Sequence, residues 1–315
     1  MPTLGGKIKK SKMVKFKGLS DLGVIIRTEQ DCIDFFESAI WKGKPVSPFD
    51  PTSEVWNLAN NQYMCKNTGK RFNIKKGTIF ENSKISLRNW FISLFLLYSN
   101  KKGISSLQLP KYFKTTQKTA WFILHRLRNV CDTPLFKKMF GRDVEIDETY
   151  VGGSNSNRHW DKKVLHSQGR SWKDKVPMLV IIERGGNVIV EKVPNVEQKT
   201  LEPIIRTYVE EGSTVYTDEW KAYNGLRKWY NHEMVIHRKK QYVNGKASTN
   251  SAENFNSHLK RGLNTYHWIS KKHSQGYANE AAFRYNTRKW SEKNRFDLVL
   301  ALTTGKRLTY QQLIS

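Results

Sequence analysis

The stretch Val144-Glu-Ile-Asp-Glu-Thr-Tyr-Val-Gly-Gly153 decides the fold of this chain. Its valines and isoleucine are typical of a buried strand, and the two glycines end it. Successive side chains of a strand point to opposite faces, so Glu145 and Asp147 share one face while Ile146 occupies the other. Because carboxylates are unusual inside an apolar strand, these residues are candidates for a functional site.

Segments with strand and helix patterns alternate after this stretch. Arg184-Gly-Gly-Asn187 is typical of a hairpin turn between two of the strands. Together the segments predict a mixed α/β sheet over residues 140–290, in an order compatible with a ribonuclease-H-like fold. The expected strands are 176–182, 188–193, 214–217 and 234–236, and the expected helices lie near 200–209, 250–261 and 276–290.

Four further segments surround this domain. Residues 1–27 carry many lysines and predict a basic flexible arm. Residues 28–82 are rich in turns, and residues 63–72 within them predict a small hairpin. Residues 83–136 are helical in pattern, and residues 291–315 are expected to be a C-terminal tail.

The helical segment predicts three helices. The first spans 87–98, a short second begins at residue 104 and is limited by Pro110, and Thr115 or Thr116 caps the third. A short turn before a basic third helix favours a helix-turn-helix unit in which Arg126 and Arg128 contact DNA. The alternative is a plain three-helix bundle.

The charge of the chain indicates its partner. Among 315 residues, Lys and Arg number 54 and Asp and Glu number 28, giving a formal charge of +26. Such an excess favours a polyanion, and its spread along the chain favours nucleic acid over a membrane surface. The 38% hydrophobic and 12% aromatic content predicts folded cores.

Several classes of protein are excluded. No apolar run reaches the roughly 20 residues of a membrane span, and the N-terminus lacks the apolar region of a secretory signal. The three cysteines, Cys32, Cys65 and Cys131, are far apart, so a disulfide framework is not expected. The cysteine content fits a reducing, cytoplasmic setting.

Three acidic residues from separate elements could meet at the sheet edge. Asp147 lies in the first strand, Asp218 ends a later strand, and Glu253 lies on a later helix. Close carboxylates repel one another, and two Mg²⁺ ions would relieve that repulsion and support phosphodiester displacement. Lys260 follows Glu253 by two helical turns, so it shares that helix face and could hold a DNA phosphate.

Each of these residues also has an ordinary structural interpretation. An Asp at a strand end is more often a turn or cap residue. Glu253 and Lys260 on an exposed helix would usually be solvated surface. Glu148 is interpreted as an ordinary neighbour of Asp147, and Glu145 as a structural residue. The spacing by itself therefore leaves the catalytic hypothesis open.

At these residues the chain resembles insertion-sequence transposases of the ISXO type, the prokaryotic relatives of the Merlin elements. The resemblance covers nearly the whole chain. The matching strings are the opening stretch 144–153, Glu183-Arg-Gly-Gly186, Tyr216-Thr-Asp-Glu-Trp-Lys-Ala-Tyr223, Thr249-Asn-Ser-Ala-Glu-Asn-Phe255, Leu259-Lys-Arg-Gly262, Thr265-Tyr-His267, Phe283-Arg-Tyr-Asn286, Gly77-Thr-Ile-Phe80 and Thr119-Ala-Trp-Phe122.

The resemblance implies an acidic-triad transposase with a ribonuclease-H-like core. It assigns Asp147, Asp218 and Glu253 to the metal-binding triad and Lys260 to the associated basic position. Asn250 falls on a position listed as catalytic in some members, so it is a secondary candidate for the third position. A neutral amide is a weaker ligand than a carboxylate, which favours Glu253. The implied cofactor is Mg²⁺ or Mn²⁺, two ions per site.

The chain departs from the family pattern at several positions. Ser248, Asn256 and Asn264 stand where His, Trp and Gly are usual. The four-Cys zinc ribbon of the family is also degraded, because a single cysteine with hydroxyl groups cannot form a tight zinc site. Zinc is therefore not expected, although the ribbon shape can persist. The four corresponding positions are Ser47, Asp50, Cys65 and Thr68.

The sequence therefore predicts a transposase that binds the terminal inverted repeats of its own element and cuts and joins DNA. A DNA-bound homo-oligomer is expected, because two ends must be brought together. The alternatives are a catalytically silent DNA-binding protein derived from a transposase and another ribonuclease-H-like nuclease. In a prokaryote the protein would be nucleoid-associated. The expected DNA-contacting residues, besides the two arginines above, are Arg158, Lys162, Lys163, Arg170, Lys260 and Arg261.

Overall fold

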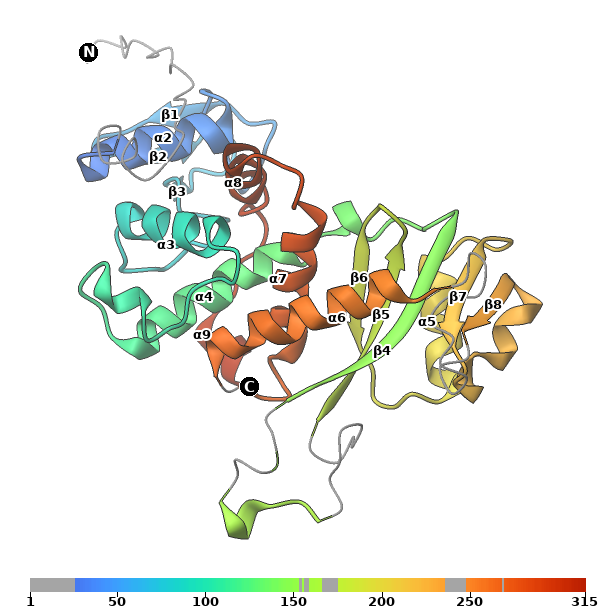
Figure 1. Ribbon diagram of the computed structural model, residues 1–315. Coiled ribbons are helices and arrows are strands. Elements are labelled where there is room, and N and C mark those ends of the chain that lie inside the picture. The colour runs from blue at the N-terminus through green and yellow to red at the C-terminus, as the bar shows by residue number, and fades with distance from the viewer. Residues whose placement is uncertain (1–25, 153–154, 156–158, 166–174, 236–247, 268) are drawn as a thin grey trace. The chain divides into compact units, whose positions relative to one another are not determined.

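The computed structural model describes residues 26–152, 155, 159–165, 175–235, 248–267 and 269–315 (Figure 1). The chain divides into two compact units. One unit comprises residues 1–100, 106–130 and 290–315, and the other comprises residues 101–105 and 131–289. The expected catalytic domain of 140–290 lies almost entirely in the second unit. Among the described residues, no helix has the length and apolar character needed to cross a membrane.

A five-stranded mixed sheet forms the centre of the second unit, as the sequence predicted. Its order is β6-β5-β4-β7-β8. Strand β4 pairs with β5 antiparallel and with β7 parallel, and β8 continues the parallel half. This arrangement matches the ribonuclease-H-like expectation. The strands are β4 (Asp143–Val151), β5 (Val176–Glu183), β6 (Val188–Lys192), β7 (Thr214–Asp218) and β8 (Asn231–Val235).

Helices cover both faces of this sheet (Figure 1). Helix α5 (Gln198–Tyr208) packs with Val144 and Ile146 of β4 in one apolar core. Helices α6 (Asn250–Leu263) and α7 (Ser274–Asn286) pack in a second core. The core on the α6 side contains Val151 of β4, so the face of that strand that carries Glu145 and Asp147 is the face that α6 covers. Short 3₁₀ helices are η2 (Pro134–Phe136), η4 (Trp160–Lys162), η5 (Lys221–Lys228) and η7 (Asn264–Tyr266).

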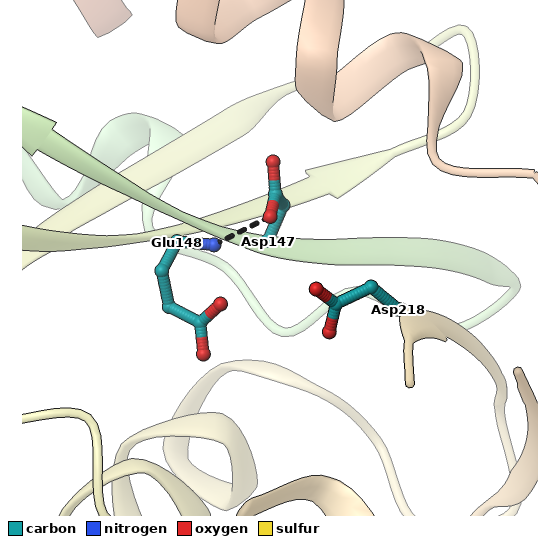
Figure 2. A group of neighbouring side chains, drawn as sticks. All are labelled: Asp147, Glu148 and Asp218. Atoms are coloured by element: carbon teal, nitrogen blue, oxygen red, sulfur yellow. Dashed lines mark hydrogen bonds between the residues drawn. The ribbon is translucent and has the colours of Figure 1, made fainter. Parts of the chain in front are cut away.

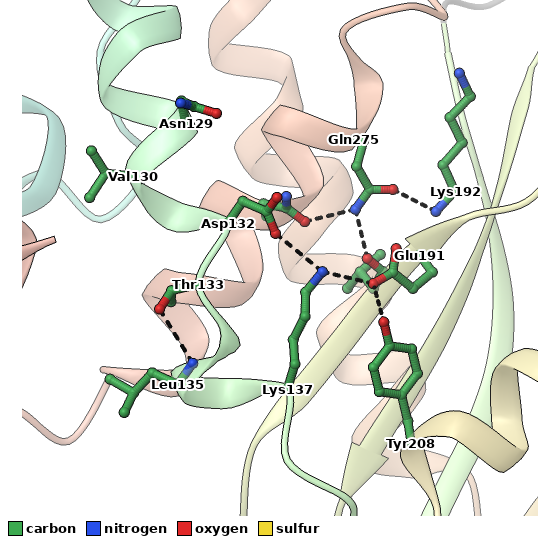
Figure 3. A network of polar contacts seen from close by, with 12 residues as sticks. Asn129, Val130, Asp132, Thr133, Leu135, Lys137, Glu191, Lys192, Tyr208 and Gln275 are labelled. Atoms are coloured by element: carbon green, nitrogen blue, oxygen red, sulfur yellow. Dashed lines mark hydrogen bonds and ion pairs between the residues drawn. The ribbon is translucent and has the colours of Figure 1, made fainter. Parts of the chain in front are cut away.

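A polar network fastens the segment before β4 to the sheet (Figure 3). The Nζ atom of Lys137 lies 3.0 Å from Oε1 of Glu191 on β6 and 3.2 Å from Oδ1 of Asp132. The hydroxyl of Tyr208 at the end of α5 donates to the same Glu191 oxygen at 2.9 Å. Burial acts to lower the pKa of Lys137, but the two carboxylates outweigh it and raise that pKa.

The N-terminal part of the first unit contains helix α2 (Glu29–Trp41) and a three-stranded antiparallel sheet. Strands β2 (Tyr63–Cys65) and β3 (Arg71–Phe72) form the predicted hairpin, with Tyr63 opposite Phe72. Gly69 has φ of 65°, a left-handed conformation that glycine adopts without strain, and it closes the turn. Strand β1 (Val55–Asn57) pairs with β2.

Cys65 lies at the centre of the region where the zinc ribbon was expected. Its side chain is fully buried. Burial acts to raise the pKa of this thiol, but hydrogen bonds with Ser47, Ser53 and Thr68 together lower it to about 6. Two of the four expected ribbon positions, Ser47 and Thr68, therefore surround Cys65. The other two cysteines, Cys32 and Cys131, are buried core residues as predicted.

The expected helix-turn-helix is not formed as predicted. Helix α3 (Leu87–Ser99) and helix α4 (Gln117–Cys131) match the first and third predicted helices, and the Thr116 hydroxyl accepts from the backbone of Thr119 to cap α4. Between them, the only helical segment is η1 (Leu109–Lys111), a single 3₁₀ turn. The prediction of a second helix from residue 104 is therefore wrong. Only residues 104–109 lie between Gly103 and Pro110, which is fewer than two turns of an α-helix, and this stretch forms turns and the start of η1 instead.

The C-terminal residues 291–315 are not a tail. They form helices α8 (Glu292–Ala301) and α9 (Tyr310–Ile314), and they belong to the first unit. The Phe296 ring lies 5.0 Å from the Phe91 ring of α3, centroid to centroid, and is 2% exposed. The C-terminal segment therefore shares a core with helix α3. Sequence pattern does not report such a long-range contact, which explains the different expectation.

Candidate active site

Asp147 and Asp218 lie level with each other on neighbouring parallel strands. Asp143 of β4 pairs with Thr214 of β7, and Glu145 pairs with Tyr216. Continuing this register by two residues brings Asp147 opposite Asp218, the last residue of β7. The two carboxylates that the sequence selected therefore meet at the carboxyl end of β7.

Glu148 joins these two residues, and Figure 2 shows the three side chains together. One carboxylate oxygen from each of Asp147, Glu148 and Asp218 lies within 4.8 Å of the others. Glu148 points to the opposite face of β4 from Asp147, and the sequence interpretation of Glu148 as an ordinary neighbour did not include it in the group. Strand β7 ends at Asp218, so it does not continue along β4 beyond Asp147. The carboxylates of Asp147 and Glu148 can therefore both reach Asp218.

Burial and neighbouring negative charge both act on the Glu148 carboxylate. Burial, the largest effect, and the charges of Asp218 and Asp147 together raise the pKa of Glu148 to about 7. The nearby Tyr223 hydroxyl acts in the opposite direction and lowers this pKa. Burial and the same carboxylates hold the pKa of Tyr223 well above its ordinary value. A positive charge at this position would relieve the repulsion.

Helix α6 contacts the carboxylate group through an asparagine. The side-chain Nδ2 of Asn256 donates to Oδ2 of Asp147 at 2.7 Å. The other oxygen of Asp147, Oδ1, accepts from the backbone N–H of Glu148 at 2.8 Å. The orientation of the Asp147 carboxylate is therefore determined by both β4 and α6.

Glu145 holds the start of α6 against the sheet. Its carboxylate is 1% exposed, and it accepts from the backbone N–H groups of Ser251 at 2.7 Å and Ala252 at 3.0 Å. The Nε of Arg184 donates to it at 2.7 Å, and the same guanidinium donates to the Ser248 carbonyl at 2.8 Å. Negative charge at a helix N-terminus is favourable, so this contact both caps and positions α6. These contacts agree with the interpretation of Glu145 as a structural residue.

The remaining triad candidates lie on α6 but outside the close group. Glu253 is exposed and accepts from the Thr249 hydroxyl at 3.3 Å. It precedes Asn256 by three residues, so the two side chains are neighbours on the helix surface. Asn250, the secondary candidate, is exposed at the first turn, and Lys260 is exposed two turns after Glu253.

The two arginines expected to contact DNA from helix α4 are buried. Arg126 is 4% exposed and Arg128 is 2% exposed. Arg126 donates to the carbonyl oxygens of Ile79 at 2.8 Å, Glu81 at 3.0 Å and Leu308 at 2.9 Å. Arg126 therefore joins separate segments of the first unit, and both side chains are buried, so the expectation of direct DNA contact is corrected. A basic pattern on a helix does not show which face the rest of the chain covers.

The structure describes some of the other basic candidates for DNA contact. Lys162 and Lys163 are exposed in and after η4, beside Trp160, which is 86% exposed. Arg261 is exposed on α6 beside Lys260. Arg158 and Arg170 lie outside the described residues.

The carboxylate group fits a hard divalent cation. Its donors are oxygens from three carboxylates, with no sulfur or imidazole in the close group. Mg²⁺ and Mn²⁺ prefer oxygen ligands of this kind. Asp147 and Asp218 would provide ligands from two strands, and Glu148 adds a third carboxylate.

Comparison with known proteins identifies the family. Residues 139–286 match the family described as the ISXO2-like transposase domain. A Halobacterium salinarum relative, described as an uncharacterized protein in transposable element ISH50, is 30% identical over 219 residues, which is 67% of this chain and 73% of the relative. A Haemophilus influenzae relative, described as an uncharacterized transposase-like protein, is 35% identical over 94 residues, covering 30% of this chain and 76% of the relative.

The ribonuclease-H-like sheet and these matches place the chain in the class of insertion-sequence transposases. Within that class, the chain belongs to the ISXO2-like family. The family resemblance found in the sequence is thereby confirmed.

Proposed function

We propose that this protein binds the terminal inverted repeats of an insertion sequence and catalyses Mg²⁺-dependent cleavage and strand transfer. The observation that supports this most directly is the meeting of Asp147, within β4, and Asp218, at the carboxyl end of the parallel strand β7, with Glu148 beside them. Clustered carboxylates of this kind are suited to divalent cations. A bound pair of Mg²⁺ or Mn²⁺ ions supplies charge stabilisation for the attacking and leaving oxygens of phosphodiester displacement.

The proposed reaction has two displacement steps at phosphorus. In the first, a water molecule loses a proton as its oxygen bonds to the phosphorus at the element end. The bond from phosphorus to the 3′ oxygen breaks, and that oxygen takes up a proton. The products are a free 3′-hydroxyl and a 5′-phosphate. In the second, that 3′ oxygen loses its proton, bonds to a target phosphorus and displaces a target 3′ oxygen, which takes up a proton. Asp147 and Asp218 hold the cations in both steps, and Asn256 and the Glu148 backbone keep Asp147 oriented.

The third cation ligand is proposed to be Glu253, in line with the family resemblance. Glu253 is exposed on the helix that contacts Asp147, so it is accessible to a bound cation and to DNA. Glu148 is an additional carboxylate of the same site. Separate Glu148→Gln and Glu253→Gln variants distinguish the two: the residue that is the third ligand loses cleavage when its charge is removed. Asn250→Ala tests the secondary candidate in the same assay.

Exposed basic side chains are proposed to hold the DNA. Lys260 and Arg261 lie on α6, the helix that contacts Asp147, so they are suited to phosphates close to the cleaved bond. Lys162 and Lys163 form a second basic site beside the exposed Trp160. We further propose that two or more protomers bring two element ends together, acting on DNA in the cytoplasm.

The test is a cleavage and joining assay on the element's own ends with Mg²⁺. The wild type is compared with Asp147→Ala, Asp218→Ala and a control, Glu233→Gln, which changes an exposed acid on β8 of the same sheet. Metal-dependent 3′-end cleavage and joining by the wild type and the control, lost in both aspartate variants, is the expected result. End-specific binding without cleavage by any of the four proteins would refute the catalytic proposal and favour a silent DNA-binding protein.

A further inference from the structure

Asn256 is a buried side chain whose orientation is determined by its neighbour. It is 7% exposed, and its Nδ2 lies 2.7 Å from Oδ2 of Asp147. An ionised carboxylate can only accept hydrogen bonds, so the amide must turn its NH₂ group toward Asp147. The amide oxygen, Oδ1, therefore has a fixed direction too.

That amide oxygen is left without a hydrogen-bond donor. Oδ1 of Asn256 is buried, and no donor among the described residues reaches it. An unsatisfied buried acceptor costs about 1–3 kcal/mol, so such atoms usually mark a water, an ion or a functional role. The oxygen belongs to the same amide group as the Nδ2 that contacts Asp147, so it lies at the edge of the carboxylate group.

The partner that suits this oxygen is a hydrated cation. The nearby group of Asp147, Glu148 and Asp218 is rich in acceptors, and its carboxylates offer a proton only when protonated. Mg²⁺ retains several water molecules when it binds to carboxylates, and these waters donate hydrogen bonds to nearby acceptors. A cation at the carboxylates would therefore satisfy Oδ1 and relieve the carboxylate repulsion at once.

We propose that Asn256 completes the cation site, with Nδ2 orienting Asp147 and Oδ1 accepting from the hydrated divalent cation. This inference rests on the cation site of the proposed function. It assigns a role to a position where the chain departs from the usual Trp. It also explains how α6 is joined to the site, since Glu145 holds the start of the helix and Asn256 holds its second turn.

Binding of Mn²⁺ to the full-length protein without DNA tests this proposal, with calorimetry or electron paramagnetic resonance as the readout. The variants are Asn256→Leu, which has similar volume but no polar atoms, and Asn256→Asp, which keeps an oxygen acceptor. Asn254→Leu is the matched control, because Asn254 is exposed on the same helix. Asp147→Ala identifies the binding event that belongs to the carboxylate site.

Asn256→Leu is expected to weaken Mn²⁺ binding about 10–100-fold, the usual effect of removing a group that supports metal ligands. Asn254→Leu is expected to leave affinity unchanged, and Asn256→Asp to bind at least as tightly as the wild type. Wild-type affinity in Asn256→Leu overturns the proposal. An Asn256→Asp variant as weak as Asn256→Leu overturns the acceptor role of Oδ1. If Asn256→Leu does not fold without metal, as judged by circular dichroism, the Asn256→Asp comparison decides.

Failure of the proposed function gives a different result. In that case Asp147→Ala binds Mn²⁺ as the wild type does, or neither protein binds it. The Asn256 variants and the Asn254→Leu control then have the same Mn²⁺ affinity. Failure of the Asn256 inference alone leaves a wild-type binding event that depends on Asp147 and is unaffected by Asn256→Leu.

Discussion

Replacing Glu145 with leucine is expected to destabilise the second unit by about 3 kcal/mol, because it leaves a guanidinium and two helix N–H groups without their acceptor. The carboxylate accepts from Arg184 at 2.7 Å, from the Ser251 and Ala252 backbones at 2.7 and 3.0 Å, and from the Ser251 hydroxyl at 3.2 Å. Breaking one partner of a buried pair costs about 3–5 kcal/mol. The lower end applies because Arg184 is 25% exposed and keeps its contact with Ser248.

Urea unfolding and amide hydrogen exchange of the variant measure this effect. For a unit of this size, about 3 kcal/mol corresponds to a fall in Tm of roughly 6–12 °C. Exchange should increase first at the start of α6, where Ser251 and Ala252 lose their acceptor. Leucine fills nearly the same volume as glutamate, so a cavity contributes little to the loss.

A double-mutant cycle tests the reasoning. Glu145→Leu combined with Arg184→Leu leaves no uncompensated charge, so the pair should show a coupling of about 1–3 kcal/mol. Glu233→Leu, on the exposed surface of β8, should change stability by less than about 0.5 kcal/mol. A loss below about 1 kcal/mol for Glu145→Leu, with unchanged exchange in α6, would refute the capping role of Glu145.

Three further results are expected. Changing Lys162 and Lys163 together to glutamate should weaken DNA binding at all sequences. In fluorescence anisotropy titrations, the slope of log affinity against log salt should fall by about 2, and an unchanged slope would show that DNA does not contact these lysines. Burial, followed by the charge of Arg227, lowers the pKa of His232 from 6.5 to about 4 in the folded protein. The unfolded chain therefore binds a proton more readily, so the free energy of unfolding should be full above pH 6.5 and fall as the pH drops toward 4. Thermal unfolding across that range should show this loss in the wild type and a flatter profile in His232→Gln. Lys137→Met should destabilise the second unit by about 1–3 kcal/mol by removing the donor shared by two carboxylates, and a denaturation midpoint equal to that of the wild type would contradict this.

The periodic parts of the fold could be predicted from the sequence. Alternation around Asp147 indicated strand β4, and the helical spacing after Thr249 indicated α6. These signals are local, because the side chains of a strand or helix repeat with a period set by the backbone itself. The family motifs also selected Asp147 and Asp218, and the parallel pairing of β4 and β7 places these two residues level.

Contacts between distant segments required the tertiary structure. Glu148 was interpreted as an ordinary neighbour of Asp147, because alternation places the two side chains on opposite faces of β4. Only the tertiary structure shows that both carboxylates reach Asp218 where β7 ends. Arg126 and Arg128 were expected at the surface because charged side chains are usually exposed. The carbonyl groups that Arg126 contacts come from residues 47 and 182 positions away, which a local pattern does not include.

The same distinction separates what the sequence by itself determined from what only the folded chain decided. The sequence determined the order of strands and helices from β4 to α7, the basic character and the two aspartates. The tertiary structure decided that α6 begins at the Glu145 carboxylate and reaches Asp147 through Asn256. The physical reason is that backbone periodicity acts over a few residues, while a site forms where strand register and helix packing bring side chains about 100 positions apart within hydrogen-bonding distance.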